Sequence, residues 1–223
     1  MSQNLSKCIK YSIYLIVFFG YFPAFAGSYE DFFRAVKQDD AGTIRSLLTK
    51  GFDPNVRDPN GQNGLFLAIR EPSPHVANTL IDWPKTEVES RTRADESPLM
   101  LAALKGQTDI VKKLIARGAD VNKPGWTPLH YAATNGHTEI MALLLDNHAY
   151  IDASSPNDST PLMMAALYGS ASAVKLLLEA GADPSIKNRL GLTAIDFAHR
   201  DKRTEAAEII AAFVRGREPK GKW

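Results

Sequence analysis

A short motif that returns about every 33 residues is the feature that most constrains this chain. The stretch Thr127–Ala133, Thr-Pro-Leu-His-Tyr-Ala-Ala, returns as Thr160–Ala166, Thr-Pro-Leu-Met-Met-Ala-Ala, and a related stretch lies upstream at Ser97–Ala103. One alanine holds the same place in every copy, with gaps of 33, 34, 30, 33 and 33 residues: Ala35, Ala68, Ala102, Ala132, Ala165 and Ala198. A fixed period of this length is typical of a solenoid, because one unit alone cannot bury its apolar face.

Each copy carries the signals of two helices. Thr127 and Thr160 are good helix N-caps, and each is followed by a proline at the first helical position, where a missing N–H costs nothing. In the second half, apolar residues fall at i, i+1, i+4 and i+5 from Ile110 and again from Ala173, which places them on one helix face. A glycine then ends this second helix by adopting a left-handed conformation, which costs other residues more.

These motifs resemble the ankyrin repeat, and the stretch Gly125–Ile140 is almost the consensus of that family. The resemblance covers about residues 29–214. It implies an all-α ankyrin-repeat solenoid of about six helix-turn-helix units, joined by β-hairpin or loop fingers, in a domain over 27–214. The predicted units are 30–62, 63–96, 97–126, 127–159, 160–192 and 193–214.

Three irregularities carry further expectations. Pro72, Pro74 and Pro84 crowd the second half of unit two, which predicts a short second helix there. The loop 122–126 lacks three residues relative to its counterparts, so we expect a stunted finger. Residues 215–223 are basic, and we expect them to form a mobile tail.

The first 26 residues have the order of a signal peptide. Lys7 and Lys10 precede an uncharged apolar run over 11–22, and the small-x-small sequence Ala24–Ala26 follows. We expect cleavage between Ala26 and Gly27, and a periplasmic or secreted protein that does not associate with the membrane afterwards. An uncleaved anchor is the alternative, because the uncharged run is at the lower limit of a span. The only cysteine precedes the apolar run, so the mature chain would lack thiols.

Charge and motifs argue against several function classes. The net charge is +1, which gives no general attraction to nucleic acid. We find no nucleophile elbow, zinc-protease or dithiol motif, and the five histidines show no paired ligand spacing. The resemblance gives His130 a structural role between loops. We therefore expect no enzyme, no catalytic residue, no bound metal and no cofactor.

Ankyrin-repeat proteins usually bind partners on a concave face made of finger tips and first helices. Carrying that over by position, we expect a protein partner to contact residues of both kinds: Arg70, Arg93, Glu96, Lys105, Trp126, Thr134, Asn135, Asn157, Tyr168 and Arg189. Trp126 and Tyr168 are the strongest candidates, because large aromatics dominate many interfaces. The alternative is that Trp126 only shields the short loop and Tyr168 only ends a helix.

The sequence thus favours a non-catalytic scaffold in the cell envelope that holds or protects one protein. We expect it to be monomeric alone. Signal-bearing ankyrin chains resemble periplasmic bacterial proteins, which implies this role. An immunity protein that neutralises a periplasm-delivered toxin and a secreted, host-directed effector are alternatives within the same class. A haem-handling accessory protein or an enzyme is the alternative from a different class.

Overall fold

The computed structural model describes residues 27–217. The predicted signal peptide and residues 218–223 of the tail lie outside this range, so cleavage at Ala26 stays a prediction. The described chain divides into two compact units, with the boundary after Thr86. We call them the N-terminal unit and the C-terminal unit and describe each by itself.

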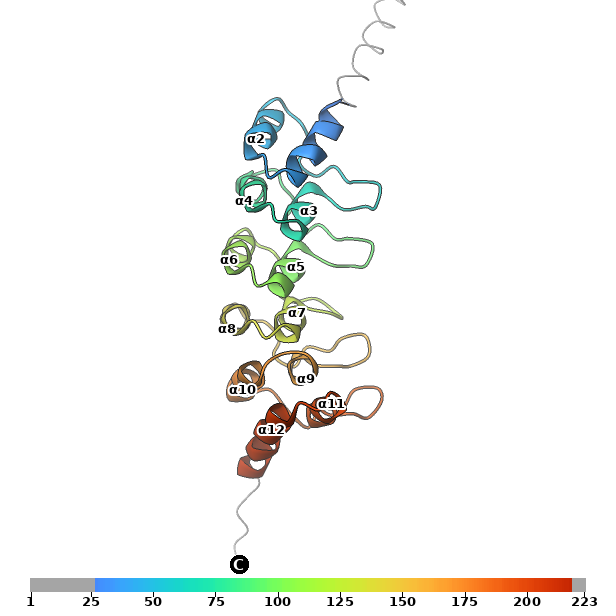
Figure 1. The fold of residues 1–223 in the computed structure, drawn as a ribbon, viewed down its shortest axis with the longest axis vertical. Coiled ribbons are helices and arrows are strands. Elements are labelled where there is room, and N and C mark those ends of the chain that lie inside the picture. The colour runs from blue at the N-terminus through green and yellow to red at the C-terminus, as the bar shows by residue number, and fades with distance from the viewer. Residues whose placement is uncertain (1–26, 218–223) are drawn as a thin grey trace, which may run out of the picture. The chain divides into compact units, whose positions relative to one another are not determined.

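The N-terminal unit consists of two helix pairs. Residues 27–37 are helical and precede α2, Ala41–Thr49, and the second pair is α3, Gly64–Arg70, with α4, Pro74–Asp82. Helix α4 packs against both α2 and α3 (Figure 1). The prediction of a short second helix in unit two is wrong. Helix α4 has nine residues, as do α6 and α8, because Pro74 occupies its first position and Pro84 follows its C-cap Trp83.

The C-terminal unit contains four helix pairs. Their first helices are α5, Pro98–Lys105; α7, Pro128–Thr134; α9, Pro161–Leu167; and α11, Ala194–Arg200. Their second helices are α6, Thr108–Ala116; α8, Thr138–Asp146; α10, Ala171–Glu179; and α12, Thr204–Arg217. First helices pack on neighbouring first helices and second helices on neighbouring second helices, which gives two stacked layers (Figure 1). The helix-turn-helix solenoid predicted from the sequence is confirmed.

The local signals in the sequence explain where the helices begin and end. Thr127 and Thr160 are the N-caps of α7 and α9, each with proline at the start, as expected. Gly118 and Gly181 follow α6 and α10 with φ of 83° and 106°. The counterpart after α8 is His148, which has a φ of 65° and therefore takes the left-handed conformation without being glycine.

Small and apolar side chains make the core of the C-terminal unit. The alanine pair Ala132–Ala133 is fully buried, so α7 lies close to its neighbours, and Leu144 is fully buried in α8. At the far end, α12 continues to Arg217, three residues past the predicted end of the repeat domain. The Arg217 guanidinium lies 4.3 Å from the ring centre of Phe213 and makes a cation–π contact within the last turn of the helix.

The fingers that join one helix pair to the next are loops rather than strands. In the described chain, the sole β-bridge joins Arg57 to Asn63. In the C-terminal unit, Thr92, Ser155 and Asn188 each donate their backbone N–H to the carbonyl oxygen four residues on, at 3.0 Å. The finger before α7 is shorter and projects less far than those before α9 and α11, as predicted (Figure 1).

Candidate protein-binding groove

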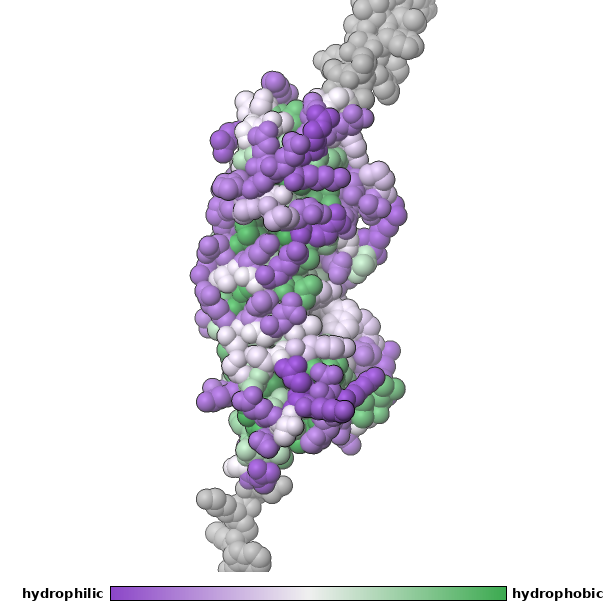
Figure 2. All heavy atoms as spheres, viewed as in Figure 1, coloured by the Kyte–Doolittle hydropathy of each residue, from purple (hydrophilic) through white to green (hydrophobic). Residues whose placement is uncertain are grey.

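A groove of about 250 Å³ crosses the first helices of the C-terminal unit. Residues from α5, α7 and the end of α9 line it, together with the short finger: Leu104, Trp126, His130, Tyr131, Thr134, Met164 and Tyr168. The visible surface in Figure 2 is mostly hydrophilic, with hydrophobic side chains in small patches. Trp126 and Tyr168 are two of the five large hydrophobic side chains exposed in residues 27–217. This groove is therefore a concentrated apolar contact surface.

Trp126 is placed by the local sequence on either side of it. Gly125 before it has a φ of 84°, and Thr127 after it is the N-cap of α7, so the backbone turns sharply at the tryptophan. Its ring meets the His130 ring edge-on, with centroids 5.2 Å apart, and 36% of the residue remains exposed. The indole is thus held in position on one side and open to solvent on the other.

His130 forms the buried wall of the groove and joins two fingers. Its Nδ1 accepts the Thr127 backbone N–H at 3.2 Å, so Nε2 carries the proton and donates to the Ser159 carbonyl oxygen at 2.9 Å. Burial lowers the pKa of His130 to about 4, and the ring is neutral at pH 7. The structural role expected for this histidine is confirmed by these contacts.

Tyr131 and Tyr168 close the groove from two successive repeats. The Tyr131 hydroxyl donates to Glu96 Oε1 at 3.2 Å, and burial raises the pKa of Tyr131 to about 12. Tyr168 is the C-cap of α9 and is 59% exposed. Its carbonyl oxygen accepts a 3.5 Å contact from Arg203 in the next repeat, which fixes the backbone while the side chain stays open.

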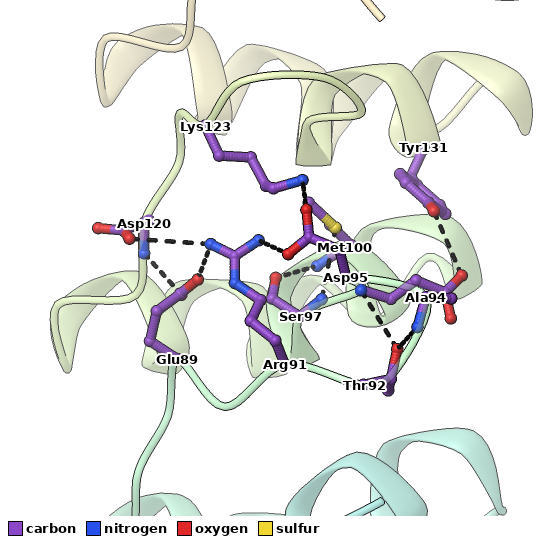
Figure 3. A network of polar contacts seen from close by, with 11 residues as sticks. Glu89, Arg91, Thr92, Ala94, Asp95, Ser97, Met100, Asp120, Lys123 and Tyr131 are labelled. Atoms are coloured by element: carbon purple, nitrogen blue, oxygen red, sulfur yellow. Dashed lines mark hydrogen bonds and ion pairs between the residues drawn. The ribbon is translucent and has the colours of Figure 1, made fainter. Parts of the chain in front are cut away.

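A network of charged side chains supports the short finger from below (Figure 3). Lys123, at the start of that finger, pairs with Asp95, and Arg91 pairs with Glu89. Glu89 Oε2 also accepts the backbone N–H of Asp120 at 2.9 Å. The hydrogen bond from Lys123 lowers the pKa of Asp95, whereas burial raises the pKa of Glu89. The network anchors the loop that carries the groove tryptophan.

Three of the residues predicted to bind a partner meet in this groove: Trp126, Thr134 and Tyr168. Glu96 does not line the groove, but it accepts a hydrogen bond from the hydroxyl of the groove residue Tyr131. Lys105 is the exposed last residue of α5, next to the groove residue Leu104.

The remaining predicted residues lie elsewhere or are engaged. Asn135 donates its side-chain amide to the Leu104 carbonyl oxygen at 2.7 Å, so it joins two repeats. Arg189 donates from its backbone to Asn157 at 3.1 Å and pairs with Asp158. Arg93 is exposed on its finger tip. Arg70 belongs to the N-terminal unit, where its guanidinium contacts Gln62 and Glu71.

Leu104 was not among the predicted binding residues. The signal was available, because Leu104 stands two residues after Ala102, the same offset at which Thr134 follows Ala132. Leu104 is partly exposed at this offset, whereas its counterpart Leu167 is buried. Tyr131 and Met164 each stand one residue before the repeated alanine, and both lie in the groove wall.

Residues 27–217 bring no three His, Cys, Asp or Glu side chains together as a metal site would require. No helix in this range is long and apolar enough to cross a membrane.

A family model described as ankyrin repeats (3 copies) matches residues 32–124, 99–188 and 151–216. The chain therefore belongs to the ankyrin-repeat family, whose repeat domains are protein-binding scaffolds and are generally not catalytic.

Two curated proteins illustrate the similarity in sequence. The B-cell lymphoma 3 protein homolog of Mus musculus is 31% identical over 152 residues, which cover 65% of this chain and 34% of that protein. The nuclear factor NF-kappa-B p105 subunit of Gallus gallus is 30% identical over 161 residues, which cover 69% and 16%. This chain thus spans about a third of the length of the first relative and 16% of the second.

Solved structures show the same fold. The human ASB11 ankyrin repeat domain has a TM-score of 0.74 at 26% identity, with 86% of both chains covered. An ankyrin repeat domain from Acinetobacter baumannii has a TM-score of 0.71 at 26% identity, with 82% of this chain and 97% of that chain covered. A chain from the complex of a Bdellovibrio bacteriovorus predatory endopeptidase with an immunity protein has a TM-score of 0.72 at 25% identity, with the same coverage.

Proposed function

We propose that this protein is an exported scaffold that holds or protects one protein partner in the cell envelope through the groove of its C-terminal unit. The observation that carries the proposal is the gathering of exposed Trp126 and Tyr168 around one hollow on the first helices. Aromatic side chains held by a rigid frame lose little entropy on binding. Repeat stacking and the charged network provide that frame.

The test is capture of the partner by the purified chain from envelope extract, followed by affinity measurements with the partner identified by mass spectrometry. Trp126→Ala should weaken binding by about 2 kcal/mol or more, as expected for an aromatic hot spot. Lys175→Ala is the matched control, because Lys175 is an exposed residue of a second helix that pairs only loosely with Glu179, at 3.8 Å. Equal loss in both variants, or loss only with Lys175→Ala, contradicts a groove interface.

Export rests on the order of charge, apolar run and small residues in 1–26. N-terminal sequencing of the protein from the envelope fraction should begin at Gly27. Intact Met1 on protein from the cytoplasm would contradict export. Recovery of the processed chain from the culture medium would instead favour the secreted effector.

An immunity role is the second candidate, and one observation favours it. A chain of similar fold occurs in a structure titled as a complex of an endopeptidase with an immunity protein. If this chain has that role, the captured partner is a toxin such as a peptidase, and adding the purified chain inhibits it. A captured protein whose activity is unchanged or preserved supports the protective scaffold. Absorbance of the purified protein in the haem region would support the haem-handling alternative.

A further inference from the structure

The groove is aromatic on three sides, and this composition selects the ligand chemistry. Trp126, Tyr131 and Tyr168 come from the short finger, α7 and the end of α9. The faces of aromatic rings carry negative electrostatic potential and attract cations, most strongly when several rings share one site.

Charged groups of both signs lie near the groove, and the negative charge lies beside Tyr131. Glu96 accepts a hydrogen bond from the Tyr131 hydroxyl at 3.2 Å, so a carboxylate lies at the hydroxyl end of this ring. His130 in the wall is neutral. Arg203 is directed at the backbone carbonyls of Tyr168 and Gly169. Lys105, exposed beside Leu104, and Arg203 are the opposing charges at the rim.

We propose that the groove receives an arginine side chain of the protein partner. The flat guanidinium stacks on aromatic faces and can donate hydrogen bonds at its edge, here to the hydroxyls of Tyr131 and Tyr168. Lysine has a compact, strongly hydrated charge that stacks less well. The inference rests on the proposed function, because it names the partner group that occupies the same groove.

The experiment uses the full purified chain and three blocked tripeptides as probes. Their central residues are arginine, citrulline (its neutral near-isostere) and norleucine (an apolar chain of similar length). Binding is followed through the indole N–H signal of Trp126 in nitrogen-15 NMR, assigned by its loss in Trp126→Phe. The arginine peptide should shift this signal and bind about tenfold more tightly than the citrulline peptide. Equal binding of the two peptides, or tighter binding of norleucine, overturns the proposal.

Two variants test the sign of the electrostatics. Glu96→Gln keeps the hydrogen bond to Tyr131 but removes the charge. It should weaken binding of the arginine peptide by about threefold or more without changing binding of the citrulline peptide. Lys105→Ala should strengthen binding of the arginine peptide by about twofold. A change of the opposite sign in either variant overturns the proposal. Circular dichroism of each variant checks that the fold is retained.

The outcomes separate this inference from the proposed function. If the partner binds and Trp126→Ala weakens it, but citrulline equals arginine, the groove is an interface and the guanidinium assignment is wrong. If Trp126→Ala leaves partner affinity unchanged, the groove interface itself is wrong, whatever the peptides do.

Discussion

His130 makes the stability of the C-terminal unit depend on pH, and its replacement by methionine measures the effect. The histidine is fully buried, and its neutral ring accepts from Thr127 and donates to Ser159. Protonation would place a second N–H opposite the Thr127 N–H. Methionine is the informative substitute, because Met100 and Met163 hold the same place in the flanking repeats and accept the corresponding N–H through sulfur at 3.4 Å.

The sign and size of this pH dependence follow from the pKa of His130, which is about 4 in the folded protein against an ordinary value of 6.5. A lowered histidine pKa means that the unfolded chain binds more protons between these values, so stability is complete above pH 6.5 and falls as the pH drops. Each pKa unit corresponds to about 1.4 kcal/mol, which gives a loss of about 2 kcal/mol between pH 8 and pH 5. The loss approaches about 3 kcal/mol below pH 4.

Urea unfolding of the wild type and His130→Met, followed by circular dichroism at pH 8, 6.5 and 5, tests this. At pH 8 the variant should be less stable by about 1 kcal/mol, because the Ser159 carbonyl loses a donor. At pH 5 the difference should vanish or reverse. The other titrating groups occur in both proteins and cancel in the comparison. Parallel losses of stability in the two proteins would refute the reasoning.

The remaining predictions concern packing in the C-terminal unit. Leu144→Ala should lower the free energy of unfolding by about 2–5 kcal/mol, because it empties a fully buried site in α8; unchanged urea unfolding would show that α8 is not packed as described. Gly169→Ala should destabilise more than Gly118→Ala, because a Cβ at 169 would lie 2.3 Å from the Ala133 carbonyl oxygen, whereas that at 118 meets nothing within 4 Å. Gly118→Ala should cost about 1 kcal/mol through its φ of 83° alone, and equal thermal shifts in the two variants would contradict the steric argument.

Much of the fold could be predicted because its determinants are local. The N-cap threonine, the proline after it and the terminal glycine act within a few residues, and the 33-residue period repeats them. The prediction of a short α4 was wrong because it depended on the number of prolines and not on their positions. Pro74 lies at the first helical position and Pro84 lies beyond the end, so neither interrupts the helix.

The composition of the groove was harder to predict because it depends on pairs of residues far apart in sequence. The positions of Trp126, Thr134 and Tyr168 within their repeats place them on one face, so this part of the groove could be predicted from the sequence. The engagement of Asn135 with the preceding repeat and of Tyr131 with Glu96, 35 residues away, was not. Such contacts follow from how neighbouring repeats stack, which the motif alone does not specify.

The three residues missing from one finger open a hollow beside it. A full finger pairs with the next one, as Arg189 does by donating its backbone N–H to the Asn157 carbonyl oxygen. Pro156 stands one period before Arg189 and has no N–H to donate toward the short finger. A hollow of about 650 Å³ lies there instead, with Tyr150 exposed in its lining. Trp126 directly precedes Thr127, the N-cap of α7, and lines the groove. A local deletion in a regular array therefore leaves an irregular hollow with an exposed aromatic side chain, which is a feature that a specific partner can recognise.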